Sequence, residues 1–184
     1  MAHDRRTQIL SEAAILFAER GFHGVSVHDI GAACGISGPA IYRHFAGKDD
    51  LLAQSLTAIS ERHVAEATAR VAAHEDADDA LRSLIAWHID FAIDHPELIV
   101  IQDREWSNLT PAAQRRVRDL QLTYIDAWVG VLRRLRTDLD AAEARAAVQA
   151  MFGLLNSPPH SAHISESRMR LLLEQMARSA LLTA

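Results

Sequence analysis

The side chains best suited to chemistry with a partner lie on one short predicted helix. Ile41 and Phe45 are four residues apart, so both fall on the same buried helical face, and Tyr42 and Arg43 then point outward with His44 at the margin. An outward arginine on such a helix can hold guanine O6 and N7 through two hydrogen bonds. Tyr42 and His44 suit phosphate oxygens or thymine methyl groups. This arrangement predicts contact with duplex DNA.

Further polar groups stand at helix starts on either side of this predicted recognition helix. Lys48, the single lysine of the chain, follows it at the expected start of the next helix, where free backbone N–H groups also favour an anion. Ser26 and His28 occupy the matching start of the preceding helix. The complete set of predicted DNA-binding residues is Ser26, His28, Ser37, Gly38, Pro39, Tyr42, Arg43, His44 and Lys48.

The elements that must position these side chains form a helix-turn-helix pattern. Apolar residues recur at helical spacing over residues 5–20, and a glycine ends that helix. Ser26, followed three residues later by Asp29, predicts the start of a second helix with a capping box that has Asp in place of Glu. Ser37 is the expected N-cap of the third helix, residues 37–45. In such a motif the second of the two reading helices enters the major groove.

Composition limits the classes to which the protein can belong. The 184 residues include 19 Lys and Arg against 24 Asp and Glu, a net charge of −5, so affinity for DNA would depend on where individual cations lie. The single cysteine, Cys34, excludes an internal disulfide and a cysteine-rich metal site, and we expect it to be a small buried residue. The sequence shows neither a signal-peptide segment nor a membrane-spanning run, which predicts a cytoplasmic protein with no membrane partner.

The rest of the chain also has helical periodicity, so the predicted fold class is all-α with about nine helices. The six further helices are expected at residues 48–74, 80–94, 96–108, 111–136, 140–155 and 165–182, with residues 156–163 as a loop. We expect a three-helix helix-turn-helix domain at residues 1–47, fused to a helical ligand-binding and dimerisation domain at residues 48–184.

The segment FAERGFHGVSVHDIGAACGISGPAIYRHFAGKDDLL resembles the N-terminal domain of the TetR family of bacterial transcriptional regulators. The matching features are the phenylalanine-x-x-x-glycine entry, Ser26, Ile30, Gly35, the Ile41-Tyr42-x-His44-Phe45 core and Lys48. The resemblance implies an all-helical homodimer that binds a palindromic double-stranded operator and represses until a small effector binds its C-terminal domain.

The same resemblance implies roles for single residues. Phosphate contacts would be made by Ser26, His28, Tyr42, His44 and Lys48. Base-facing positions would be Gly38, Pro39 and Arg43. The Gly38-Pro39-Ala40 run departs from the family, which usually has Thr or Ser in the third place, and this concentrates base reading on Arg43.

Beyond residue 52, the stretch LIVIQDREWSNLTPAAQRRVRDLQ is similar to TetR-type regulators that respond to acyl-CoA or related lipid thioesters. An apolar effector with an anionic end near Arg104 is therefore expected. The candidate effector-binding residues are His88, Phe91, Gln102, Arg104, Trp106, Tyr124, Trp128, Phe152 and Asn156. Core packing is an alternative role for each aromatic residue, and a surface ion pair is an alternative for Arg104.

Two apolar stripes near the C-terminus predict a homodimer. They consist of Ala144, Val148, Met151 and Leu155 on one helix, and Met169, Leu172, Leu173, Met176 and Ala180 on the next. Paired across a two-fold axis, these stripes would form a four-helix interface. Packing within one chain is the alternative.

Three other functions are compatible with the sequence. A multidrug-type regulator would sense lipophilic cations, with Asp90, Asp94 or Glu105 as counter-charge. A constitutive DNA-binding regulator would need no effector, and a helical-bundle enzyme or ligand carrier would not bind DNA specifically. No catalytic or phosphate-binding motif occurs, and the His160-x-x-His163 pair lacks a supporting carboxylate or cysteine, so we expect no enzyme, cofactor or metal site.

Overall fold

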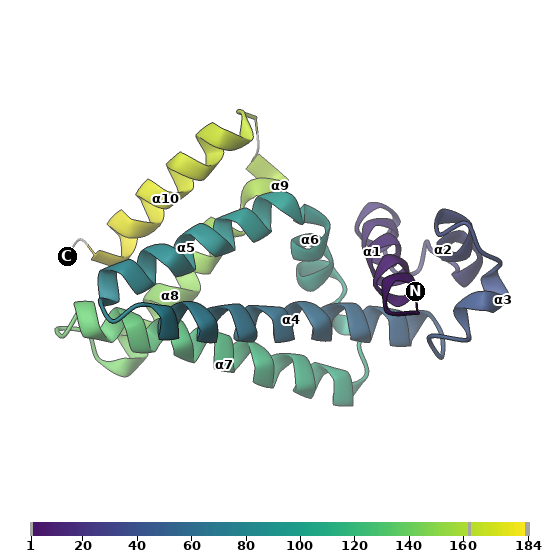
Figure 1. The fold of residues 1–184 in the computed structure, drawn as a ribbon, viewed down its shortest axis with the longest axis horizontal. Coiled ribbons are helices and arrows are strands. Elements are labelled where there is room, and N and C mark those ends of the chain that lie inside the picture. Colours follow the sequence, from purple (N-terminus) through teal and green to yellow (C-terminus); the bar gives the residue numbers. More distant parts are fainter. Residues whose placement is uncertain (1, 162, 183–184) are drawn as a thin grey trace. The chain divides into compact units, whose positions relative to one another are not determined.

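The computed structural model describes residues 2–161 and 163–182, and in this part of the chain it contains ten α-helices, a short 3-10 helix and no strand (Figure 1). The elements are α1 (Ala2–Arg20), α2 (Val27–Ala33), α3 (Gly38–Ile41), α4 (Lys48–Ala73), α5 (Ala77–Asp94), α6 (Pro96–Arg104), η1 (Trp106–Asn108), α7 (Pro111–Leu135), α8 (Ala141–Leu155), α9 (Pro158–Ser161) and α10 (Glu166–Leu182). The predicted all-α class is confirmed. Among the described helices, none is both long and apolar enough to cross a membrane.

The chain divides into two compact units. Unit 1 comprises Met1–Ser60 and Glu97–Arg118, and unit 2 comprises Glu61–Pro96 and Asp119–Ala184. Both α4 and α7 begin in unit 1 and end in unit 2. Unit 1 therefore contains the helix-turn-helix segment together with most of α6 and the start of α7.

Unit 1 is built around apolar side chains that recur every three or four residues along its helices. The largest of its fully buried side chains are Phe17, Ile9, Ile30, Ile41, Leu51, Leu52 and Leu56. Burial of each such side chain contributes about 1.5–3 kcal/mol relative to exposure. Because these residues come from α1, α2, α3 and α4, the core fixes which face of α3 remains outward.

The regular part of α3 is shorter than the predicted span of residues 37–45. It ends at Ile41, but the N–H groups of His44 and Phe45 both donate to the carbonyl of Ile41, at 2.9 and 3.1 Å. These bonds continue the helical turn, so Phe45 still reaches the core at 2% exposure. The residues between the two anchors consequently keep the outward direction predicted for Tyr42 and Arg43.

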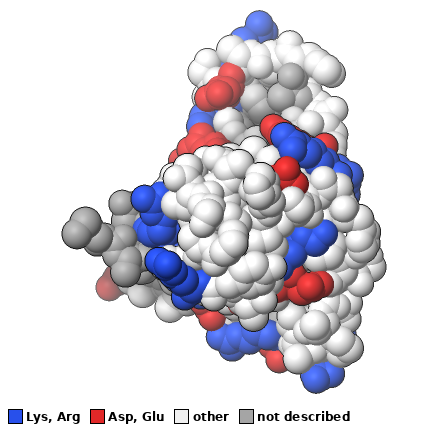
Figure 2. Space-filling view, turned by 90° about the vertical axis from the view of Figure 1, so that its right-hand side faces the viewer, with Lys and Arg blue, Asp and Glu red and all other residues white. Residues whose placement is uncertain are grey.

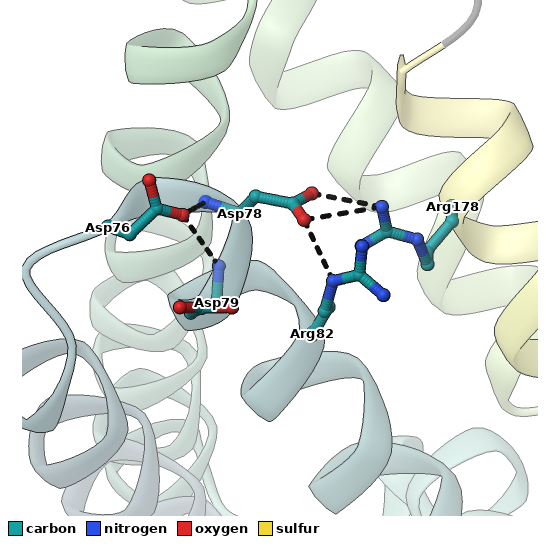
Figure 3. A network of polar contacts seen from close by, with 5 residues as sticks. All are labelled: Asp76, Asp78, Asp79, Arg82 and Arg178. Atoms are coloured by element: carbon teal, nitrogen blue, oxygen red, sulfur yellow. Dashed lines mark hydrogen bonds and ion pairs between the residues drawn. The ribbon is translucent and has the colours of Figure 1, made fainter.

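In unit 2, α10 packs against α5 and α8, and ion pairs fix its inner side (Figure 3). Asp76 caps α5, its Oδ1 accepting from the N–H groups of Asp78 and Asp79 at 2.8 and 3.0 Å. The carboxylate of Asp78 then accepts from Arg82 on α5 at 2.8 Å and from Arg178 on α10 at 3.0 Å. These contacts attach the C-terminal half of α10 to the start of α5.

A second arginine attaches the other half of α10. Arg170 forms ion pairs with Asp90 and, at 2.6 Å, with Asp94, both on α5. Since polar anchors and buried apolar residues hold this side of α10, the opposite side is left to solvent. Exposed there are Leu171, Leu172 and Met176.

The dimer stripe predicted on α8 is wrong, because all four of its residues are buried inside their own chain. Ala144, Val148 and Leu155 are 0% exposed and Met151 is 2% exposed. The α10 stripe is divided: Met169 and Leu173 are buried, whereas Leu172, Met176 and Ala180 are exposed. The outward side of α8 carries the small residues Ala142, Ala146, Ala150 and Gly153.

The short helix α9 lies in the stretch that the sequence predicted to be a loop. It begins at Pro158, whose missing N–H and fixed φ suit the first turn of a helix. A Pro-Pro pair therefore starts one helical turn here.

Candidate nucleic-acid interface and effector site

Close backbone contact between α2 and α3 sets the geometry of the helix-turn-helix. A Cβ added to Gly31 would lie 2.9 Å from the backbone nitrogen of Gly38 and 3.0 Å from the carbonyl oxygen of Ile36. Gly35 closes the turn at φ +66°, a conformation that costs glycine little. Gly38 is buried against the Cα of His28, so it faces α2, contrary to its predicted outward position.

The start of α2 is fixed by reciprocal capping. The N–H of Asp29 donates to Ser26 Oγ at 3.1 Å, and the N–H of Ser26 donates to Asp29 Oδ2 at 2.8 Å. The predicted capping box is thus confirmed. Hydrogen bonds from the side chain and backbone of Ser26 hold the pKa of the Asp29 carboxyl below its usual value.

The outward side of α3 and of the helical turn that follows it carries the side chains best placed to meet DNA. Tyr42 is 59% exposed and Arg43 is exposed, and neither side chain has a hydrogen bond or ion pair with the described residues. His44 is half-buried at the margin. Of the predicted DNA-binding residues, the exposed ones are Ser26, His28, Ser37, Pro39, Tyr42 and Arg43. The structure therefore brings most of the predicted set to the surface of α2 and α3.

Lys48 is already engaged inside unit 1. Its Nζ donates to the carbonyl oxygen of Phe22 at 2.7 Å and lies 4.3 Å from the centre of the Phe22 ring. An ammonium group has three donors, so this contact leaves capacity for an anion. Phosphate contact by Lys48 stays a prediction, and the structure adds an internal role in holding the loop between α1 and α2.

Two arginines of α1 hydrogen-bond to the backbone at the ends of α2 and α3. The sequence pattern did not single them out. Arg5 Nη1 donates to the carbonyl of Cys34 at 3.2 Å, and Arg6 Nη1 donates to the carbonyl of His44 at 3.0 Å. The Arg6 guanidinium also lies 4.6 Å from the centre of the Phe45 ring. Because their acceptors are backbone carbonyls, no residue-type pattern marks them.

A buried carboxylate ties the end of α6 to the loop after α1. Glu105 is 5% exposed, and its Oε1 accepts from the N–H of Phe22 at 3.2 Å while Oε2 accepts from Asn108 Nδ2 at 2.7 Å. The adjacent Arg104 donates from Nη1 to the carbonyl of Ala18 at 3.2 Å. The backbone of Phe22 is therefore held on both sides, by Glu105 at its N–H and by Lys48 at its carbonyl.

We expect Glu105→Gln to lower the unfolding free energy by about 1–3 kcal/mol, because the amide offers only one acceptor and leaves a buried donor without a partner. Chemical unfolding followed by circular dichroism measures the change. Asp103→Asn, an exposed position two residues away, is the matched control and should change stability by less than about 0.5 kcal/mol. Equal effects of the two variants would contradict the assigned role of Glu105.

Bulk charge does not mark the interface. On the face drawn in Figure 2, Lys and Arg side chains form separate groups with Asp and Glu among them rather than one continuous basic surface. Affinity for DNA must therefore come from individually placed groups such as Arg43 and the start of α2.

Unit 2 contains a buried group of rings that we call the aromatic cluster. It comprises His63, Trp87, His88, Phe91, Tyr124, Trp128 and Phe152, with Asn156 at its edge. Tyr124 and Phe152 stack with centroids 5.3 Å apart and planes at 11°, and His88 stacks on Phe152 at 5.0 Å. Six of the nine predicted effector-binding residues are thus brought together, and His63 is an addition that sequence reasoning missed.

Hydrogen bonds order the polar side of this cluster. His88 Nδ1 lies 2.9 Å from the Tyr124 hydroxyl, and His88 Nε2 lies 2.9 Å from Asn156 Oδ1. With Nε2 protonated, His88 donates to Asn156 and accepts from Tyr124, which satisfies both ring nitrogens of a neutral imidazole. Burial lowers the pKa of His88 to about 4 and raises the pKa of Tyr124. Burial also lowers the pKa of His63 well below its usual value.

The other three predicted effector residues lie in unit 1, outside this cluster. Gln102 is half-buried on α6, and Arg104 is exposed. The carbonyl of Trp106 accepts from Gln114 at 3.1 Å, and the Arg118 guanidinium lies 5.8 Å from the Trp106 ring centre. The structure gives Arg104 and Trp106 contacts within unit 1.

Comparisons with known proteins identify both parts of the chain. A family model of bacterial regulatory proteins, the tetR family, matches residues 9–54, and a tetracyclin repressor-like C-terminal domain matches residues 74–160. The HTH-type transcriptional repressor KstR2 of Rhodococcus jostii (strain RHA1) is 29% identical over 144 residues, which are 74% of this chain and 70% of that protein.

Solved structures share the fold. A TetR-family regulator from Bordetella parapertussis 12822 has a TM-score of 0.84 at 20% identity, covering 96% of this chain and 93% of that one. FadR from Bacillus subtilis, in complex with stearoyl-CoA, has a TM-score of 0.73 at 17% identity, covering 95% and 98%.

A helix-turn-helix with an exposed reading face, joined to a second helical unit, defines a DNA-binding transcriptional regulator. The chain belongs to the TetR family of bacterial transcriptional regulators. The matched families and relatives are regulators and not enzymes, which sets the enzyme and carrier alternatives aside.

Proposed function

We propose that the protein is a homodimeric, effector-responsive repressor that reads a palindromic operator through two copies of α3. The observation that carries this proposal is the exposed, unpaired pair Tyr42 and Arg43, opposite the buried anchors Ile41 and Phe45. Dimeric helix-turn-helix proteins place their reading helices in major grooves about one helical turn apart. The exposed apolar side of α10 offers a surface for the second copy. We place this activity in the cytoplasm, where the operator lies.

The test begins with an operator selected from random duplexes. Arg43→Ala is expected to weaken binding to that operator by roughly 1–3 kcal/mol and to relax selectivity at one base pair in each half-site, because a bidentate base contact is lost. Fluorescence anisotropy against the operator and against single-base variants measures both effects. Unchanged affinity and selectivity would show that α3 is not the recognition helix.

Lys48→Ala gives the contrasting result. A lost phosphate contact should weaken binding to all sequences alike and reduce the slope of log K against log salt by about one. If Lys48 only holds Phe22, thermal stability falls while the salt slope stays unchanged. The two variants together separate base reading from backbone contact.

For the effector, we propose an acyl-CoA or similar lipid metabolite whose apolar part enters unit 2. The aromatic cluster offers an apolar lining, and the structural relative FadR was solved with stearoyl-CoA. The structure supports the lipophilic-cation alternative less, since Asp90 and Asp94 are already paired with Arg170, and Glu105 accepts from Phe22 and Asn108.

The helix α4 belongs to both units, so it connects the proposed effector site in unit 2 to the helix-turn-helix in unit 1. It carries Lys48 at its start in unit 1 and His63 of the aromatic cluster fifteen positions later, in unit 2. We propose that effector binding favours a position of α4 in which the spacing of the two α3 copies in the dimer no longer matches the spacing of the two half-sites. Release of the operator requires the effector to bind this conformation of the protein more tightly than the operator-bound conformation.

A further inference from the structure

Two polar atoms in the aromatic cluster lack a hydrogen-bond partner among the described residues, Nε2 of His63 and Nε1 of Trp128. Nε2 of His63 is buried and makes no hydrogen bond with the described residues, and the whole residue is 7% exposed. His88, Tyr124 and Asn156, in contrast, satisfy one another. Buried polar atoms in folded proteins are nearly always paired, so each exception calls for an explanation. Both exceptions lie where six predicted effector residues meet, and of the two atoms only the imidazole nitrogen can either accept or donate a hydrogen bond.

Aromatic rings pack against the His63 imidazole on several sides. Tyr124 stacks on His63 with centroids 4.9 Å apart and planes at 19°. Phe91 and Trp87 meet the imidazole edge-on, at 4.5 Å and 5.2 Å with interplanar angles of 73° and 87°. A ligand group that reaches His63 would therefore meet flat aromatic faces and edges, and a flat, apolar ring matches such surroundings.

Two arginines bring positive charge near His63, Arg62 on the same helix and Arg70. Arg70, whose guanidinium lies 5.9 Å from the Trp87 ring centre, pairs with Glu66 at 3.2 Å and also donates to Ser83. Burial keeps the imidazole neutral at neutral pH. A charged group brought beside this buried imidazole would lose its hydration at a large cost, whereas an uncharged hydroxyl or carbonyl would lose less and would gain a hydrogen bond.

We propose that His63 is the polar anchor of the effector site and pairs through Nε2 with a hydroxyl or carbonyl group on a flat, otherwise apolar ring. A neutral imidazole accepts from a hydroxyl in one tautomer and donates to a carbonyl in the other. This proposal rests on the effector response proposed above and names the chemical group that the effector presents in unit 2.

Five probes with one ring system test the anchor by isothermal calorimetry. They are 2-naphthol, 2-acetonaphthone, naphthalene, 2-naphthoate and (2-naphthylmethyl)trimethylammonium. The first two are expected to bind about tenfold more tightly than the other three, because a hydrogen bond to a buried, unpaired group is worth about that factor.

Variants assign the preference to one atom. His63→Phe keeps a flat ring without the nitrogen and should remove the advantage of 2-naphthol over naphthalene, while His63→Gln should retain part of it. His160→Phe makes the same chemical change at an exposed position and should leave all five affinities unchanged. Circular dichroism checks folding, and if His63→Phe does not fold, the wild-type panel and His63→Gln still decide.

Any of four results would overturn the proposed role of His63. The wild type could bind 2-naphthol and naphthalene equally, bind either charged probe more tightly, or bind none of the five. The fourth result is an unchanged preference in His63→Phe. Operator release is measured separately by anisotropy. His63-dependent binding without release upholds the anchor and contradicts the proposed effector response. Release by other compounds, unaffected by His63→Phe, upholds the response and overturns the anchor.

Discussion

The double variant Leu172→Glu and Met176→Glu is expected to give a folded monomer that has lost operator binding, whereas Met151→Glu is expected to unfold the chain. Leu172 and Met176 are 44% and 43% exposed on the outer side of α10, so charges there block pairing with a second copy and leave the fold intact. Two linked reading heads bind more tightly than one by a factor on the order of 100 to 10,000, and the monomer forfeits this gain.

Met151 has a different environment although the sequence placed it in the same interface. Met151 is only 2% exposed, so a glutamate at this position would be buried without a counter-charge. This would lower the free energy of unfolding by about 4 kcal/mol or more. Sedimentation, circular dichroism and operator titration separate the two outcomes. Met151→Leu, which nearly conserves volume, is the control and should cost less than about 1.5 kcal/mol. A wild-type monomer at micromolar concentration, on the order of operator-binding conditions, would refute the proposed dimer.

The free energy of unfolding is expected to fall as pH falls from about 6.5 to about 4, by about 3 kcal/mol through His88 alone. An imidazole in the unfolded chain titrates near 6.5, while burial lowers the pKa of His88 in the folded state to about 4. Between these values the unfolded chain binds more protons, so acid favours unfolding. The contribution of His88 to the free energy of unfolding is fully present above pH 6.5. Burial lowers the pKa of His63 as well, so this residue also makes the protein less stable as pH falls.

Urea unfolding at half-unit steps of pH measures this slope. His88→Gln should be less stable than wild type at pH 7.5, because the bonds to Tyr124 and Asn156 are disturbed, but its stability should vary less between pH 6.5 and 4. His160→Phe, at an exposed position, should keep the wild-type slope. An equal slope in His88→Gln would show that His88 does not carry the linkage.

The helix-turn-helix could be predicted because its signals are local. Ser26 and Asp29 cap α2 as their spacing indicates, and Ile41 and Phe45 orient α3 as their four-residue interval requires. The direction of Gly38 could not be predicted, since it depends on the close approach of α2 and α3. Backbone contact of this kind leaves no mark in side-chain periodicity.

Interactions between distant segments were also beyond the sequence pattern. An apolar stripe such as that of Met151 looks the same whether it meets another chain or its own, and only the positions of α5 and α10 decide. His63 is a lone histidine in a long helix, and its importance depends on rings supplied by α5 and α7. Arg104 was expected beside an effector, but its guanidinium donates to the backbone of α1.

The bond between Glu105 and Phe22 decides how the reading head could be transplanted. Its two partners are 83 residues apart, so a chimaera that joins residues 1–47 to another regulator's second domain leaves the acceptor behind. The N–H of Phe22 would then be buried without a partner unless the recipient protein supplied an oxygen at the same place. A graft intended to carry operator specificity into a new regulator must therefore bring two stretches, Met1–Ser60 and Glu97–Arg118.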